Sequence, residues 1–156
     1  MGTFVLAQTP NDAVGKIDAL RGHMIMGITI GALMLVRLIV RLRSSRPPAA
    51  STGHAALDRL GNLAHIGLYV LVFAMAASGG ATALLSGLPD IVFGNTMAPL
   101  PESFFAYPPR IVHGWVAKAL FLLIGLHVIG ALFHQFSRKD RLLARMWFGN
   151  RSEPRS

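Results

Sequence analysis

Three long apolar stretches constrain the fold of this chain more than any other feature of its sequence. They are residues 22–40, 60–88 and 111–136. Inside them the only charged side chains are those of Arg37 and Lys118. A membrane-spanning helix needs about 20 mostly apolar residues, and within lipid a helix satisfies its own backbone hydrogen bonds. The sequence therefore predicts an all-α integral membrane bundle with three transmembrane helices. The predicted spans are about residues 22–43, 60–86 and 110–136.

The composition agrees with a membrane protein and argues against several other classes. Hydrophobic residues make up 53% of the 156-residue chain and charged residues 14%, whereas soluble domains have roughly 25% charged residues. The net charge is +8, but the basic residues are clustered beside the apolar stretches, so we do not expect nucleic-acid binding. The chain has no cysteine, which excludes disulfides, covalently attached c-type haem and cysteine-ligated iron–sulfur clusters.

The clusters of basic residues predict how the helices are oriented. Arg41, Arg43, Arg46 and Arg59 lie in the connection between the first two stretches, and the C-terminal tail is also basic. Lys and Arg mark the cytoplasmic side of a membrane protein, so we expect this connection and the tail to be cytoplasmic. The N-terminus and the Pro-rich second connection are then periplasmic. The predicted divisions are a short outer segment at 1–20, the transmembrane domain at 21–137 and a basic cytoplasmic tail at 138–156.

Five of the six histidines lie in or at the ends of the apolar stretches, where an ionisable side chain is a functional hypothesis by default. They are His23, His65, His113, His127 and His134. His113 and His127 are 14 residues apart, so their imidazoles share one helix face and lie about 21 Å apart along its axis. Neutral imidazole suits haem iron, and the macrocycle supplies the other four ligands. This spacing predicts a haem site near each side of the hydrocarbon core.

Each of these two histidines needs a second axial imidazole from a facing helix. His23 lies at the outer end of its span, level with His113, so these two residues form the predicted outer site. His65 is the only good candidate to face His127, although it lies about 9 Å in from Arg59 and His127 about 16 Å in from the tail. The alternative for any single membrane histidine is an interhelical hydrogen bond without metal.

Other residues in the stretches have two readings each. Arg37 is 14 residues from His23, and its guanidinium could bind a haem propionate or extend to the cytoplasmic headgroups. His134 is an interfacial residue or lies near a quinone. The small residues around Gly79 and Gly80 allow either a helix or a flat macrocycle to approach closely.

Three segments of the sequence resemble the bacterial cytochromes b561 and the related cytochrome b subunits of nickel–iron hydrogenases. RGHMIMGITIGALMLVRLIVRLRSSRPP resembles the second helix of that family in its histidine, its helix-end arginines and its Pro-Pro. LAHIGLYVLVFAMAASG resembles the third helix, with His65 and Tyr69 in register. VHGWVAKALFLLIGLHVIGALFHQFSRKDRLLARM resembles the fourth, including the paired histidines and the basic Lys-Asp-x-x-Leu tail. The resemblance covers residues from about 19 to 148.

The resemblance implies a four-helix bundle that holds two b haems, of which this chain supplies helices 2–4. His23 and His113 match the ligands of the family's outer haem, and His127 matches one ligand of the inner haem. The usual partner of His127 lies on the family's first helix, which is not evident in this sequence. Three explanations for the missing partner of His127 are open. The start of the sequence is truncated or mis-assigned, a partner subunit supplies the helix, or His65 substitutes for the usual ligand.

The sequence thus favours a bacterial inner-membrane protein with one or two haem b groups that transfers electrons between a membrane quinone, with ubiquinone as candidate, and a periplasmic partner. The competing hypotheses are a non-redox anchor for a dehydrogenase and a proton-translocating bundle. Some relatives act on superoxide, so an enzymatic activity is left open. The expected partners are the lipid bilayer, quinone, and a redox protein or dehydrogenase, with a homodimer or larger complex also open.

Overall fold

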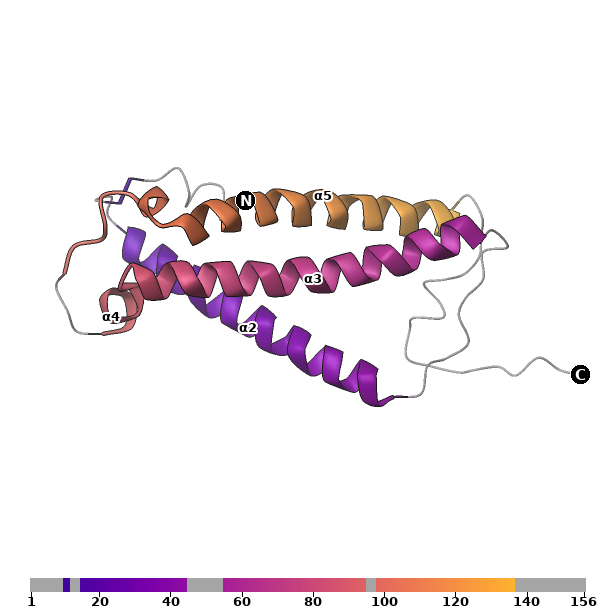
Figure 1. Cartoon of the computed structure of the whole chain (residues 1–156), viewed down its shortest axis with the longest axis horizontal. Helices are drawn as coiled ribbons and strands as arrows, with labels where there is room; N and C mark the ends of the chain where they lie inside the picture. Colours follow the sequence, from indigo (N-terminus) through magenta and orange to yellow (C-terminus); the bar gives the residue numbers. More distant parts are fainter. Residues whose placement is uncertain (1–9, 12–14, 45–54, 95–97, 137–156) are drawn as a thin grey trace, which may run out of the picture.

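The structure is a computed structural model that describes residues 10–11, 15–44, 55–94 and 98–136, and the regular elements in these ranges are all helical. The long helices are α2 (Lys16–Arg43), α3 (Ala55–Leu85) and α5 (Pro108–Phe136). A short helix, α4 (Leu88–Phe93), and a 3₁₀ turn, η1 (Phe104–Ala106), follow α3 and precede α5 along the chain (Figure 1). Each long helix is long and apolar enough to cross a membrane, so the predicted all-α bundle with three spanning helices is confirmed.

The predicted boundaries differ from the helices mainly at the first span. α2 begins at Lys16, six residues before the predicted start at Gly22, so the helix takes in the end of the segment predicted at 1–20. Most of that segment and the tail at 138–156 lie outside the described residues. The second and third helices begin and end within a few residues of the predicted limits, apart from the start of α3 at Ala55.

The packing of the long helices is uneven. α3 and α5 run antiparallel and pack along most of their length, whereas α2 approaches α3 at one end and diverges toward its own C-terminus (Figure 1). A glycine allows the close approach of α3 and α5: a Cβ built on Gly67 of α3 would lie 3.1 Å from Cδ2 of Leu123 on α5. At the contact of α2 with α3, a Cβ on Gly31 would lie in ordinary van der Waals contact, 3.6 Å from the Cβ of Ala76. Small residues at helix crossings are typical of membrane bundles.

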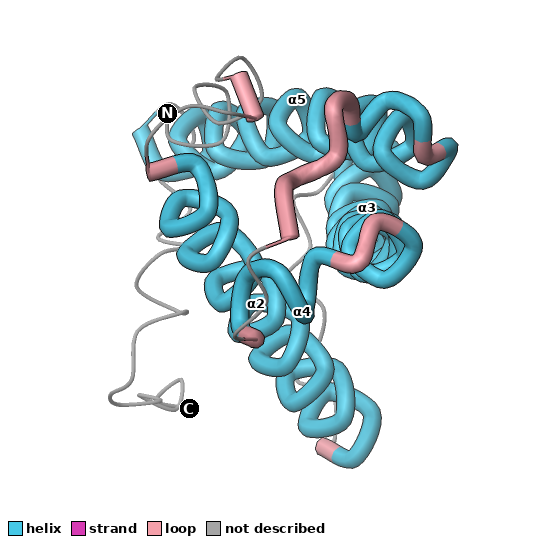
Figure 2. Tube along the Cα trace, turned by 90° about the vertical axis from the view of Figure 1, so that its left-hand side faces the viewer, coloured by secondary structure: helices cyan, strands magenta, loops and turns pink. Residues whose placement is uncertain are grey.

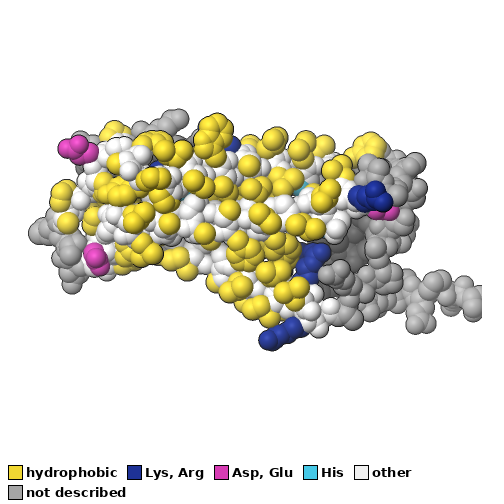
Figure 3. Space-filling model, viewed as in Figure 1, with side chains coloured by type: hydrophobic (Ala, Val, Ile, Leu, Met, Phe, Trp, Pro, Cys, Tyr) yellow, Lys and Arg dark blue, Asp and Glu magenta, His cyan; other side chains and the backbone are white. Residues whose placement is uncertain are grey.

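The two ends of the bundle differ in character. We call the end that carries α4 and η1 the α4 end, and the opposite end, where α2 and α5 finish and α3 begins, the basic end. Figure 2 looks onto the α4 end, where α4 lies beside α2 and α3. Most of the Lys and Arg side chains visible in Figure 3 gather at the basic end.

The buried core of the described residues is confined to the α4 end. Its apolar side chains are Leu20, Ala83, Leu88 and Val92. By contrast, many large apolar side chains between the two ends are exposed, for example Phe121 at 74% and Ile28 at 67%, and they cover the face seen in Figure 3. Such an apolar surface is unstable in water but matches the hydrocarbon interior of a bilayer.

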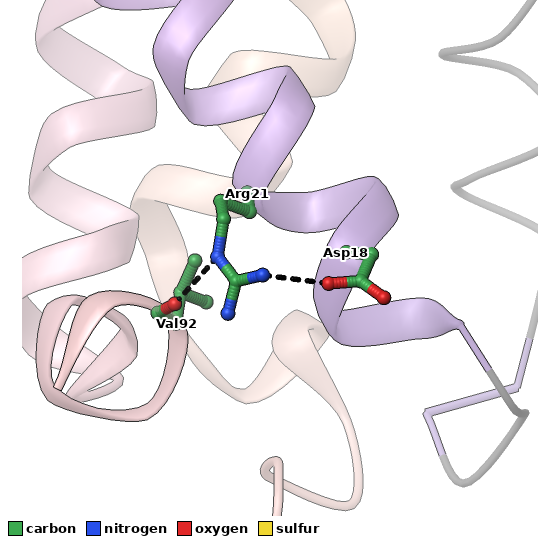
Figure 4. A network of polar contacts seen from close by, with 3 residues as sticks. All are labelled: Asp18, Arg21 and Val92. Atoms are coloured by element: carbon green, nitrogen blue, oxygen red, sulfur yellow. Dashed lines mark hydrogen bonds and ion pairs between the residues drawn. The ribbon is translucent and has the colours of Figure 1, made fainter. Parts of the chain in front are cut away.

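A polar contact attaches α4 to α2. Arg21 donates a hydrogen bond from Nε to the backbone oxygen of Val92 at 2.9 Å, and Val92 is fully buried. The same guanidinium forms an ion pair with Asp18 at 2.6 Å (Figure 4). The Asp18 side chain is 78% exposed, so this ion pair contributes little to stability, and the bond to Val92 is the one that holds α4.

We expect Arg21→Met to lower the free energy of unfolding by about 1 kcal/mol, because it removes a charge-assisted hydrogen bond while it retains most of the aliphatic stem. The measurement is SDS-induced unfolding in mixed micelles. The matched control is Asp18→Asn, which removes only the exposed ion pair and should change the same free energy by less than about 0.5 kcal/mol. Equal effects of the two variants would contradict the assignment.

Candidate functional site

The structure brings the transmembrane histidines together in two pairs. The ring centroids of His23 on α2 and His113 on α5 are 6.1 Å apart, with an interplanar angle of 82°. Those of His65 on α3 and His127 on α5 are 5.1 Å apart, with an angle of 63°. α5 therefore contributes one imidazole to each pair, and its two partners come from different helices. These are the pairs that the sequence predicts.

The depth mismatch expected for His65 and His127 does not occur. Measured from the helix ends at the basic end, His65 lies ten residues from the start of α3 at Ala55, and His127 lies nine residues from the end of α5 at Phe136. The prediction counted from the nearest charged residues instead, and Arg59 lies inside α3 by four residues. Flanking charges are therefore a poor measure of where these helices begin and end.

The His113 ring packs against one turn of α3. We call the surface that it contacts, formed by Met75, Ser78 and Gly79, the His113 seat. Its Nδ1 is 3.2 Å from the backbone oxygen of Met75 and 3.2 Å from Oγ of Ser78. A Cβ built on Gly79 would lie 3.0 Å from the ring's Cε1, so the absence of a side chain at Gly79 makes room for the imidazole. The sequence pointed to the small residues of this segment but gave no signal for the contacts to Met75 and Ser78.

The His23–His113 pair fits a metal held between two imidazoles. A bond between a metal and an imidazole nitrogen is about 2 Å long, so a metal between two rings accounts for about 4 Å of their separation. The rest of the 6.1 Å between the two centroids corresponds to the distance from each coordinating nitrogen to the centre of its own ring. Because a carbonyl only accepts, the contact with Met75 places a proton on Nδ1 of His113, and Nε2 keeps the lone pair that iron needs.

The His65–His127 pair fits less well as it stands. Its centroid separation of 5.1 Å is 1.0 Å shorter than that of the other pair, so the two rings must move apart before both can bind one metal. His65 is exposed and His127 is partly exposed, so the surrounding packing leaves room for this movement.

Arg37 lies near the second pair and is held by an aromatic residue of α3. It donates a hydrogen bond from Nε to the hydroxyl of Tyr69 at 3.2 Å, and Cζ of Arg41 lies 5.7 Å from the centroid of the same ring. Both positive charges act electrostatically on His65. Two guanidinium groups from successive turns of α2 therefore converge on one tyrosine beside the His65–His127 pair.

Cationic groups also lie near the first pair. The positive charge of Arg110 acts on both His23 and His113, and its Cζ lies 5.1 Å from the ring centroid of Phe105. Farther along α5, Nζ of Lys118, the only charged residue in the apolar stretch 111–136, lies 4.5 Å from the ring centroid of Trp115. The side chain of His134 and the whole of His54 are outside the part of the chain that the structure describes.

Together, the three membrane-spanning helices and the facing imidazoles on them define a class: an integral membrane helical bundle with candidate ligands for haem iron at two levels. The family model described as prokaryotic cytochrome b561 matches residues 2–149. The chain belongs to the prokaryotic cytochrome b561 family. Membership implies a multi-pass bacterial membrane protein with b-type haem that takes part in electron transfer.

Known relatives cover most of the chain. It is 31% identical over 126 residues to the probable superoxide oxidase CybB of Yersinia pestis, and the match covers 80% of this chain and 72% of the relative. It is 32% identical, with the same two coverages, to cytochrome b561 homolog 1 of Escherichia coli. A second Escherichia coli protein, cytochrome b561 homolog 2, is 32% identical over 76% of this chain and 66% of its own length. No solved structure matches the chain.

We expect Gly79→Ala to weaken haem binding because the new methyl group would press on the His113 ring and tilt it away from His23. A disturbed ligand environment typically costs about 10-fold or more in metal affinity. The measurement is haem content per chain, by the pyridine haemochrome assay, after purification at a fixed haem supply. Gly80→Ala is the control because a Cβ at Gly80 meets nothing within 4 Å. Equal haem content in the two variants would contradict the seat assigned to His113.

Proposed function

We propose that this chain transfers electrons across the bacterial inner membrane between a membrane quinone and a redox partner on the periplasmic side. The observation that supports the proposal most is the presence of two imidazole pairs that share α5. Their α5 members, His113 and His127, lie about 21 Å apart along the helix axis, and the hydrocarbon core of a bilayer is about 30 Å thick. The two pairs thus belong to opposite halves of the membrane. Ubiquinone is the candidate quinone.

The proposed orientation puts the basic end in the cytoplasm. Arg41 and Arg43 lie in the last turn of α2, and positive residues are enriched on the cytoplasmic side of membrane proteins. The α4 end, with α4 and η1, is then periplasmic. In this orientation His23 and His113 form the periplasmic pair, and His65 and His127 form the cytoplasmic pair.

The four imidazoles are the proposed axial ligands. His23 and His113 bind one haem b iron between α2 and α5, and the hydrogen bond from Nδ1 of His113 to Met75 directs its Nε2 to the metal. His127 binds the second iron, with His65 as its proposed partner on α3. When bound, haem b supplies a one-electron carrier at each pair. The chain itself orients the imidazoles and carries them on helices that are apolar enough to span the membrane.

Arg37 is the proposed partner of a haem propionate at the cytoplasmic pair. A guanidinium has five N–H donors in a planar fork, and only the one on Nε is used by Tyr69. Within the described residues the terminal nitrogens of Arg37 are not engaged by Tyr69, and their fork matches a carboxylate in geometry. Tyr69 restricts the side chain, so that less conformational entropy is lost when the anion binds.

A second candidate function is oxidation of superoxide at the α4 end. One relative is named a probable superoxide oxidase, and the charge of Arg110 acts on both histidines of the periplasmic pair. A cation beside the pair would attract a small anion such as superoxide. In that function the anion gives up one electron at the α4 end, becomes dioxygen, and the electron passes to the quinone.

The ligand assignment is tested by three variants. We expect His113→Ala and His127→Ala each to lose one haem per chain, because each removes the α5 ligand of one pair, and His65→Ala to lose or alter the haem bound at His127. Haem content and the dithionite-reduced minus oxidised spectrum are the measurements. His54→Ala is the control, since it removes an imidazole that belongs to no predicted pair.

Wild-type protein without any b-haem absorption in fresh membranes would overturn the electron-transfer proposal in favour of a non-redox anchor. Unchanged haem content in both α5 variants would overturn the ligand assignment. Reduction of the haem by ubiquinol or by superoxide then distinguishes the two candidate functions.

We expect Arg37→Gln to shift the midpoint potential of only the haem bound at His127, because a positive charge beside a propionate influences the nearer iron most. Potentiometric titration monitored by absorbance measures the shift. Arg43→Gln is the control, a further charge at the same helix end. Equal responses to the two variants would favour contact of Arg37 with lipid headgroups instead.

A further inference from the structure

The buried hydroxyl of Ser78 lies against the periplasmic histidine pair and has no role in the assignment above. We propose that Ser78 is a positioning residue: with the backbone oxygen of Met75, it holds the proton of His113 on Nδ1 and thereby sets the redox potential of the iron bound at Nε2. The proposal rests on the proposed haem function, and its test is designed so that the two can fail separately.

The hydrogen-bond geometry leaves little freedom in where the protons lie. Oγ of Ser78 is 2.7 Å from the backbone oxygen of Ala74 and 3.2 Å from that of Met75. Since both carbonyls only accept, the single hydroxyl proton of Ser78 is donated to the backbone of α3, and Ala74 is the nearer acceptor. The lone pairs of Oγ then remain to accept from Nδ1 of His113, which is 3.2 Å away. The backbone oxygen of Met75, also at 3.2 Å from Nδ1, is a second acceptor for the same proton.

Burial raises the free-energy cost of losing the hydrogen bond between Ser78 and His113. Ser78 is only 8% exposed, so water has little access to replace either partner. A buried polar group that loses its partner pays its full desolvation cost. The opposite tautomer of His113 would turn an unprotonated nitrogen toward the Met75 oxygen, which can only accept. The Ser78 hydroxyl could donate to that nitrogen only by giving up its shorter bond to Ala74. The seat on α3 therefore selects one tautomer and one ring orientation before any haem binds.

A hydrogen bond of this kind changes the chemistry at the other ring nitrogen. A histidine that donates its second N–H to a carbonyl or other acceptor is a more basic ligand. A more basic ligand stabilises ferric over ferrous iron and so lowers the midpoint potential. Loss of the Ser78 acceptor leaves only Met75, so the potential of this haem should rise while that of the haem at His127 stays unchanged.

The neighbouring hydroxyls on the same face of α3 are natural controls. Thr82 and Ser86 are buried to the same extent as Ser78, with 7% and 8% of their surface exposed. Their hydroxyls donate to the carbonyls one turn back, Thr82 to Ser78 at 2.8 Å and Ser86 to Thr82 at 2.7 Å. Ser78 makes the same kind of helix bond and in addition contacts the imidazole.

The experiment compares Ser78→Ala, Ser78→Thr and Thr82→Ala in the full chain purified with its haem. We expect Ser78→Ala to keep a low-spin haem at His113 but to shift its midpoint potential upward, change its electron paramagnetic resonance signal, and release haem about 10-fold more readily. Ser78→Thr retains the hydroxyl and should restore all three properties. Thr82→Ala should leave them as in the wild type.

Three results would overturn the proposal. The first is a Ser78→Ala protein whose potentials and signals equal those of the wild type. The second is an equal change in Ser78→Ala and Thr82→Ala, and the third is no rescue by Ser78→Thr; either would mean that the effect of Ser78→Ala comes from helix packing. If Ser78→Ala loses this haem altogether while Ser78→Thr and Thr82→Ala keep it, the proposal is supported. Absence of haem from the wild type, by contrast, would defeat the proposed function itself.

Discussion

The structure depends on α5 contributing one imidazole to each of two pairs. The separation of His113 and His127 on a single helix fixes the distance between the pairs, and the partner helices must meet α5 at those two levels. α3 does so at the basic end through His65, and α2 does so at the α4 end through His23. This division matches the packing, since α3 lies along α5 whereas α2 diverges from both other helices toward the basic end (Figure 1).

Close packing of α3 against α5 and a few polar contacts also hold the described helices together. Lipid tails are as apolar as leucine, so membrane helices associate through close packing and a few polar contacts and not through the hydrophobic effect. The described residues agree with this expectation: their buried core is limited to the α4 end. Arg21 supplies a polar contact between helices at that same end, and Tyr69 and Ser78 supply polar contacts farther along the bundle. A haem ligated from two helices would join them directly, so cofactor binding and bundle stability are expected to be coupled.

The sequence predicted the helices and the pairing of histidines because both follow from the length of the apolar stretches and from the positions of the histidines within them. Apolar length identifies a span, and a separation of 14 residues places His113 and His127 on one helix face whatever lies around them. The features that the sequence could not predict depend on contacts between helices. The Met75 carbonyl has no sequence signature, Ser78 reads as an ordinary small residue, and the convergence of Arg37 and Arg41 on Tyr69 requires knowing how α2 leans on α3. The error in the expected depth of His65 has a different cause: charged residues mark the helix ends only approximately, and α3 begins four residues before Arg59.

The central claim is that imidazoles from facing helices bind iron from both sides. Electron paramagnetic resonance of the oxidised, haem-loaded wild-type protein tests it most directly, because the spin state of ferric haem reports its axial ligands. The account predicts low-spin ferric signals typical of two imidazole ligands, with one such signal assigned to the pair of His23 and His113. A spectrum consisting only of high-spin ferric haem, with one axial position open, would contradict it.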